Sequence, residues 1–265
     1  MYRRNRSKSK LLGGGSAFGL IHALAHPRVA EMIGLAGYDF IVLDGEHGPG
    51  GIAEHLACLQ AVATTPATAV VRVAPNDTGL ISRALDLGAE GIMVGDVCSA
   101  EEARTAVAAC FYPPRGKRGF SAGTVRASDY GLNIGNYLAA DGAELLVCVM
   151  IESGEGVKNV RSIAMVEGVD VIQLGPFDLS YDLGIPGQFE HPKFLTAIKK
   201  IEAAVQKAGK ILGGVPLPGL PLEAILERGY RMITVGADVP MLAAALKNGI
   251  PDIRKIRGEG KRRNG

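Results

Sequence analysis

Side chains able to bind a metal or move a proton stand at the ends of apolar runs in this sequence. In the stretch FIVLDGEHGPG, an apolar run passes directly into two carboxylates, a histidine and three glycines. Short apolar runs bounded by turn residues predict strands buried on both faces of a parallel sheet. Chemistry in such sheets collects at the carboxyl ends of the strands. The residues expected at one such rim are Asp44, Glu46, His47, Arg72, Glu152 and Asp178.

Two of these residues form a pair suited to a divalent cation. Glu152 and Asp178 follow successive predicted strands, and carboxylate oxygens are the ligands that Mg²⁺ and Mn²⁺ prefer. With two protein ligands, the cation keeps positions for water and substrate. Such a cation can chelate a 2-oxo acid and stabilise the enolate that forms when the adjacent carbon loses a proton.

His47 and Arg72 would complete this enolate chemistry. Histidine as a residue type titrates near neutral pH, so His47 is the expected proton carrier, and Asp44 is expected to orient its ring. A guanidinium inside an apolar strand needs an anionic partner, and Arg72 would add a fixed positive charge beside the enolate oxygen. Glu46 stays open, as a candidate for the outer shell of the metal.

A Schiff-base mechanism is the chemical alternative, because a lysine desolvated in an apolar interior can form an imine with a carbonyl substrate. No predicted strand carries a lysine in its interior. Lys210 precedes its strand, which would place it at the end of the sheet opposite the expected rim. An imine mechanism is therefore not expected.

Apolar runs alternate with helical patterns along the chain and predict eight βα units. Strands are expected over 17–24, 40–44, 68–73, 91–95, 145–153, 169–175, 211–217 and 231–238. With an even composition over 11–250, this pattern predicts one TIM (β/α)8 barrel domain. A doubly wound open sheet would want a glycine-rich turn after an early strand, but the glycines at 13–15 precede the first one. Residues 111–136 break the alternation and predict a functional loop or lid.

Both ends of the chain are basic, although the net charge over 265 residues is only +2. Five basic residues and no acidic residue occur in 1–10, and six basic residues and one acidic residue follow position 253. We expect 1–10 and 251–265 to be solvated basic tails. Nucleic-acid binding is not expected, because the run RRNRSKSK has no interleaved aromatic residues and the body of the chain is not basic.

Cysteine use and hydropathy bear on the compartment. The four cysteines form no CxxC pair and lie mostly in apolar segments, which indicates reduced thiols in a cytoplasmic protein. No apolar run reaches ~18 residues, and no signal-peptide core follows the basic N-terminus. Neither membrane insertion nor export is expected.

Several motifs follow one another along the chain: YDFIVLDGEHGPG, VVRV followed by Asn76 and Asp77, LDLGAEGIMV, YPPRGKRG with SAGTVRAS, VMIES and VEGVDVIQLGPFDLSYDLG. In this order they resemble the motifs of the HpcH/HpaI aldolases, which are metal-dependent class II pyruvate aldolases. The family includes 4-hydroxy-2-oxoheptanedioate aldolase and 2-dehydro-3-deoxyglucarate aldolase. The likeness spans residues 17–248.

The resemblance implies a role for each matched residue. The implied catalytic residues are His47 as base, Asp44 as its paired acid and Arg72 as the arginine that stabilises the oxyanion. The implied metal ligands are Glu152 and Asp178. Gly175, Pro176 and Phe177 match the positions where backbone amides hold the pyruvyl carboxylate, beside Arg72.

The sequence departs from the family where the acceptor aldehyde is expected to lie. Ile21 and His22 stand where the family commonly has Trp, and Phe177 stands where it has a small residue. Val215, at the seventh strand, is expected to shape the same pocket. The aldehyde therefore stays unnamed.

The resemblance implies a barrel of the phosphoenolpyruvate/pyruvate superfamily, assembled as a trimer of dimers with a C-terminal helix exchanged between subunits. The expected activity is aldehyde-lyase cleavage of a 4-hydroxy-2-oxo acid to pyruvate and an aldehyde. The expected cofactor is Mg²⁺ or Mn²⁺, with Co²⁺ as a further candidate. Two alternatives stay open: a citrate-lyase-type enzyme that cleaves a malyl or citramalyl thioester, and a barrel that binds a 2-oxo acid without catalysis.

Overall fold

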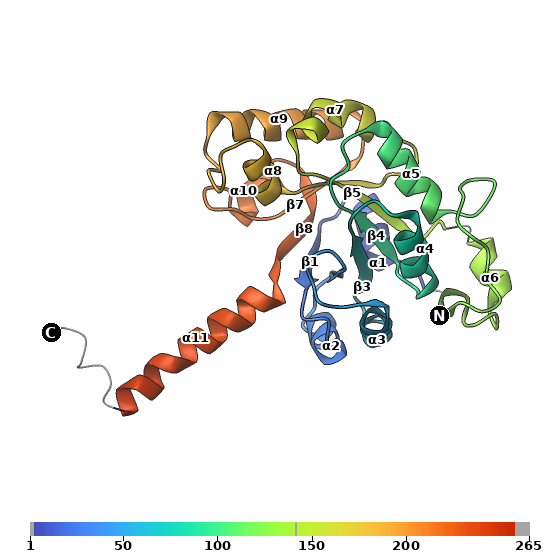
Figure 1. Cartoon of the computed structure of the whole chain (residues 1–265), viewed down its shortest axis with the longest axis horizontal. Helices are drawn as coiled ribbons and strands as arrows, with labels where there is room; N and C mark the ends of the chain where they lie inside the picture. The colour runs from blue at the N-terminus through green and yellow to red at the C-terminus, as the bar shows by residue number, and fades with distance from the viewer. Residues whose placement is uncertain (1–2, 141, 258–265) are drawn as a thin grey trace.

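The computed structural model describes residues 3–140 and 142–257 of the chain, in which eight parallel strands close into a barrel. Each strand pairs with the next along the chain, and β8 pairs back onto β1. The strands are β1 (Ala17–His22), β2 (Phe40–Asp44), β3 (Thr68–Val73), β4 (Gly91–Val94), β5 (Leu146–Ile151), β6 (Val171–Leu174), β7 (Ile211–Gly214) and β8 (Tyr230–Ala237). The predicted TIM barrel is confirmed (Figure 1).

Helices follow the strands and cover the outside of the barrel (Figure 1). Side-chain caps start several of them, because Asp77, Ser99 and Ser153 each accept a backbone N–H three residues on. The outer helices are α2 (Pro27–Leu35), α3 (Ile52–Val62), α4 (Thr78–Asp86), α5 (Ala100–Cys110), α7 (Gly154–Ala164), α9 (Pro192–Lys207) and α10 (Leu222–Glu227). Additional elements are α1 (Arg6–Leu12), η1 (Arg126–Ser128), α6 (Ile134–Ala139), α8 (Pro176–Asp182) and α11 (Asp238–Ile256).

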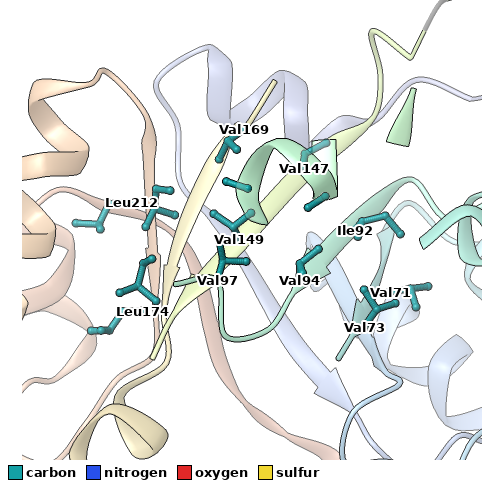
Figure 2. Packing of buried hydrophobic residues seen from close by; sticks show 14 of the residues in the cluster. Val71, Val73, Ile92, Val94, Val97, Val147, Val149, Val169, Leu174 and Leu212 are labelled. Carbon is teal, nitrogen blue, oxygen red and sulfur yellow. The ribbon is translucent and has the colours of Figure 1, made fainter. Parts of the chain in front are cut away.

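The buried apolar residues form two clusters because side chains alternate across each strand. One cluster lies between strands and helices; Figure 2 shows part of it, including Val71, Val94 and Val149. The other cluster includes the alternate positions Phe40, Val42, Val70, Cys148 and Met150, which face the barrel interior. The same alternation continues to the polar residues at the strand ends: Asp44 on β2, Arg72 on β3 and Glu152 after β5.

Helix α1 closes the amino-terminal end of the barrel, which differs from the solvated tail expected over 1–10. Leu11 is buried in the interior cluster. The basic residues of this segment pair with carboxylates that stand just before strands. Arg3 lies 2.7 Å from Glu90, Lys8 lies 3.1 Å from Asp170, and Lys10 lies 2.9 Å from Asp39. These partners are distant in sequence, so a local reading of the basic run does not reveal them.

Helix α11 leaves the barrel and projects away from it, drawn in red in Figure 1. Its exposed apolar side chains include Val239, Met241, Leu242 and Leu246. The basic tail expected over 251–265 begins inside this helix, and residues 258–265 lie outside the described residues. Within the described part of the chain, no helix is both long and apolar enough to cross a membrane.

The segment expected to form a functional loop or lid packs at the other end of the barrel from the strand carboxyl ends. The Arg126 guanidinium donates to the carbonyl of Leu87, and the Lys117 N–H donates to the carbonyl of Ala108. Both acceptors lie at the carboxyl-terminal ends of helices, which in a βα barrel stand beside the amino-terminal ends of the strands. This segment therefore does not cover the rim of its own chain.

Candidate active site

Asp44 and Arg72 form a buried, two-point ion pair at the carboxyl end of the barrel. They are register partners on the neighbouring strands β2 and β3. Arg72 Nε donates to Asp44 Oδ1 at 3.0 Å, and Arg72 Nη2 donates to Oδ2 at 2.8 Å. Burial alone would raise the pKa of Asp44, but the Arg72 hydrogen bonds and charge, with two backbone N–H groups, lower it. Asp44 is therefore an ionised carboxylate that fixes the Arg72 fork.

Asp44 holds the backbone of the loop that follows it, and not the ring of His47 as expected from the sequence. Its Oδ1 accepts the N–H groups of Glu46 at 3.1 Å and His47 at 3.2 Å. The His47 side chain is 64% exposed, and its Nε2 lies 3.7 Å from Glu46 Oε2. The expected contact differs because the Arg72 fork and the two amides already occupy the Asp44 carboxylate.

Glu46, which the sequence left without a firm role, is the residue that links the other groups of the rim. Its Oε2 lies 3.0 Å from Arg72 Nη1 and 3.7 Å from His47 Nε2. Its negative charge also contributes to the raised pKa of Glu152. The sequence shows that Glu46 follows a strand, but its contact with Arg72 depends on how β2 and β3 pair.

Glu152 is buried in a space made by two glycines, and its pKa is raised to about 7. Burial is the largest cause, and the charges of Glu46, Asp178 and Asp96 add to it, against a lowering hydrogen bond from the Asp96 N–H at 2.6 Å. A Cβ atom on Gly175 would lie 2.3 Å from Glu152 Oε2, and one on Gly95 would lie 3.3 Å from Oε1. The glycines therefore allow the carboxylate to sit among other carboxylates.

This carboxylate cluster fits the divalent cation expected at Glu152 and Asp178. All of the side-chain atoms that could bind a metal here are carboxylate oxygens, which suit hard cations such as Mg²⁺ and Mn²⁺. A positive ion would also offset the like charges that raise the pKa of Glu152. Within 3–140 and 142–257, no group of three or more His, Cys, Asp or Glu side chains is arranged to hold a metal. A cation held by Glu152 and Asp178 would take its further ligands from water and substrate.

The residues expected to hold the pyruvyl carboxylate lie at the start of α8. The Gly175 N–H donates to the carbonyl of Ile151 at 3.0 Å, and Pro176 has no N–H. Of these three residues, only Phe177 has an amide N–H that remains available to a substrate. The Phe177 side chain is 58% exposed and meets the Phe189 ring edge-on, with centroids 5.5 Å apart.

The structure places the other expected pocket residues as follows. Val215 is partly buried after β7 and packs against the core between strands and helices. His22 is 1% exposed, and its Nδ1 lies 2.6 Å from Asp238 Oδ2 at the start of α11. His22 thus ties β1 to α11 and has no exposed surface to offer an aldehyde.

Sequence reasoning missed two polar residues of this region. Asp96, at a positive φ of 41°, supplies the N–H that binds Glu152. Gln173 faces the barrel interior beside Met150 and is 2% exposed, and its Oε1 has no hydrogen-bond partner among the described residues. Gln173 lies inside an apolar run, so periodicity alone gave it the appearance of an ordinary core position.

Comparisons with known proteins agree over most of the chain. The family model for HpcH/HpaI aldolase/citrate lyase matches residues 17–245. A hydroxypyruvate/pyruvate aldolase of Sagittula stellata is 40% identical over 242 residues, which cover 91% of this chain and 95% of the relative. A 4-hydroxy-2-oxo-heptane-1,7-dioate aldolase of Salmonella heidelberg is 38% identical over 240 residues, 91% of each chain. A crystal structure of an HpcH/HpaI aldolase/citrate lyase family protein from Burkholderia cenocepacia matches with a TM-score of 0.88 and 35% identity, covering 94% of this chain and 99% of that one.

Proposed function

Because this chain belongs to the HpcH/HpaI aldolase/citrate lyase family and is a carbon–carbon lyase, we propose that it reversibly cleaves a 4-hydroxy-2-oxo acid to pyruvate and an aldehyde. One observation carries the proposal: a fixed arginine, an exposed histidine and a buried carboxylate with a pKa of about 7 converge at one rim. Perturbed ionisable groups at the carboxyl end of a barrel are typical of an active site.

Arg72 stabilises the negative charge that develops on the substrate. Asp44 fixes the guanidinium through Nε and Nη2, so its direction is set before substrate arrives. Nη1 faces Glu46 instead. In the proposed reaction, the oxygen at C2 of the substrate takes the place of Glu46 beside Nη1 and accepts a hydrogen bond from it.

His47 moves the proton. In the cleavage direction, His47 takes the proton of the C4 hydroxyl, directly or through a water molecule. The C3–C4 bond then breaks, its electron pair forms the pyruvate enolate, and the hydroxyl carbon leaves as the aldehyde. His47 then returns its proton to C3, directly or through a water molecule, which completes pyruvate and restores the neutral ring.

Glu152 and Asp178 hold the divalent cation in this proposal, with Mg²⁺ or Mn²⁺ as first candidates and Co²⁺ as a third. When bound, the cation supplies Lewis-acid stabilisation of the enolate charge. The Phe177 N–H, which follows Gly175 and Pro176 at the start of α8, donates to the pyruvyl carboxylate. The exposed Phe177 ring and Val215 border the pocket for the aldehyde.

Proton exchange of pyruvate in deuterated buffer tests the pyruvate half of the reaction. We expect the methyl proton signal of pyruvate to decay when Mn²⁺ or Mg²⁺ is present. In Glu152→Gln and Asp178→Asn the signal should persist, because exchange is lost. Glu101→Gln is the matched control, since that carboxylate is 77% exposed and pairs with Arg104 on the same helix, α5. No exchange with metal, or full exchange in both rim variants, would contradict the proposal.

A panel of aldehydes with pyruvate, run in the synthetic direction, identifies the second substrate. We expect new 4-hydroxy-2-oxo acids from at least one aldehyde. If no aldehyde reacts and an acyl-coenzyme A binds instead, the thioester-cleaving alternative takes the place of the aldolase proposal.

We further propose that α11 is exchanged between subunits in a trimer of dimers. Support comes from the family and from the exposed apolar side chains of α11, such as Leu242 and Leu246. Light scattering of the full chain should give a hexamer, and a monomer at micromolar concentration would contradict it. A cytoplasmic location is also proposed, supported by four free cysteines of which Cys58, Cys110 and Cys148 are buried.

A further inference from the structure

A cavity of about 510 Å³ lies at the amino-terminal end of the barrel, opposite the rim. Its wall includes Ala89 and Glu90, which precede β4, and Leu145, which precedes β5. The remaining wall comes from Arg3, from the ends of α4 and α5 and from the segment that carries α6, which Figure 1 shows near the N-terminus. A volume of this size suits a small organic molecule.

Aromatic rings form one side of this cavity. The Tyr112 ring meets Phe120 edge-on with centroids 5.3 Å apart and Tyr137 with centroids 6.2 Å apart. The hydroxyls of Tyr112 and Tyr137 lie 3.2 Å apart, so one of them has a proton available for another acceptor. Phe120 is 62% exposed although it is a large apolar side chain. These walls favour a flat, largely apolar ligand.

Arg118 supplies a buried donor at the same place. It lines the cavity, it is only 6% exposed, and its guanidinium carbon lies 4.7 Å from the centroid of the Tyr112 ring. Nη2 donates to Asp86 at 2.5 Å, whereas Nε has no hydrogen-bond partner in the part of the chain that the structure describes. Buried donors in folded proteins are normally satisfied. The Nε–H therefore calls for an acceptor that the described residues do not provide.

The charges of the described residues around the cavity leave place for one negative group at most. Asp86 accepts from Arg118 Nη2 and is 31% exposed, so Arg118 Nε remains for one further acceptor. The two carboxylates in the wall are engaged, Glu90 by Arg3 and Glu144 by the Asn5 N–H. A multiply charged anion such as a phosphate would meet these carboxylates without enough positive charge to offset them.

We propose that this cavity binds a small planar aromatic acid, with its ring against Tyr112, Phe120 and Tyr137 and its carboxylate on Arg118 Nε. The site is separate from the rim and does not depend on the proposed aldolase reaction. Its walls contain none of the proposed catalytic residues.

Calorimetric titration of the full chain with 2-naphthoate tests the proposal, with 2-naphthalenemethanol as the uncharged comparison. We expect saturable one-to-one binding of 2-naphthoate, unchanged by saturating pyruvate and Mg²⁺, and binding of the alcohol weaker by ~tenfold or more. Absence of saturation, equal binding of the alcohol, or displacement by pyruvate would overturn the proposal.

Substitutions then locate the ligand. Leu138→Trp fills the cavity from a side chain that is 40% exposed, and Arg118→Met removes the donor. Each should weaken 2-naphthoate binding by ~tenfold or more. Leu132→Trp, in the same segment but 92% exposed and outside the cavity wall, should leave binding unchanged. Should Arg118→Met fail to fold, Leu138→Trp decides alone: native-like unfolding temperature with undiminished binding would place the ligand elsewhere and overturn the assignment.

Discussion

The two ends of the barrel are both rich in charge, but they balance it differently. At the amino-terminal end, each of three basic residues of the α1 segment has its own carboxylate: Arg3 has Glu90, Lys8 has Asp170 and Lys10 has Asp39. At the rim, Arg72 is shared by Asp44 and Glu46, and Glu152 stands among further carboxylates. Charge that is paired one to one holds the fold together, whereas unbalanced negative charge marks the place prepared for a cation and a substrate.

The largest expected effect comes from neutralising the rim. Glu152→Gln should lower kcat/KM by about 10³-fold or more, since it removes a proposed metal ligand. The same variant should unfold, without metal, at the same temperature as the parent or a higher one, because it removes repulsion among buried carboxylates. Steady-state kinetics and calorimetry measure the two quantities. If Glu152→Gln were active or clearly destabilised, the rim carboxylates would not differ in role from the ion pairs of the amino-terminal end.

Arg72→Lys should be the next most damaging change. Lysine cannot donate two parallel hydrogen bonds to Asp44, so the charge near the substrate loses its fixed direction. We expect a loss of about 10²-fold in kcat/KM. Lys10→Met, at an exposed pair of the amino-terminal end, serves as the control and should leave kcat/KM unchanged. Parent-like kinetics in Arg72→Lys would show that the fork is not needed.

The pH dependence of stability should distinguish the ends without any substitution. The pKa of Glu152 is raised to about 7, above its usual value near 4.5, so the folded protein binds a proton more readily than the unfolded chain. The contribution of Glu152 to the free energy of unfolding of the metal-free protein should therefore be greatest below pH 4.5. It should fall by on the order of 3 kcal/mol as pH rises to about 7.

Urea unfolding at several pH values, with EDTA or with Mg²⁺, measures this effect. Saturating metal should reduce the decline, because the cation favours the ionised carboxylate, and metal affinity should weaken below about pH 7. Glu152→Gln should remove this part of the pH dependence, whereas Glu90→Gln should retain it. A decline of the same size in Glu152→Gln would assign the effect to other groups.

The smallest effects belong to the amino-terminal end. Leu11→Ala removes an apolar side chain buried in the barrel interior and should destabilise the fold by about 2–3 kcal/mol. Lys10→Met should cost less than about 1 kcal/mol, since that pair is largely exposed. Both variants should keep full pyruvate exchange while folded. Loss of exchange in folded Leu11→Ala would connect the two ends.

Much of the barrel could be predicted because its strands are local patterns. The expected strands at 40–44 and 68–73 have the same bounds in the structure, and the segments for the other six each contain or overlap the observed strand. The capping residues Asp77 and Ser99 accept backbone N–H groups only three residues further along the chain. Helix starts could therefore also be predicted. The expectation of a solvated N-terminal segment differed, because the carboxylates that bind it precede strands far along the chain.

The sequence by itself determined that polar residues would meet at one rim, because Asp44, Arg72 and Glu152 each follow an apolar column that can only face the barrel interior. Tertiary structure decided which charge meets which. Closure and register set Arg72 against both Asp44 and Glu46, turned His47 toward Glu46, and brought α1 under the barrel. An ion pair depends on distances of a few ångströms between strands, and these follow from how the barrel closes and not from spacing along the chain.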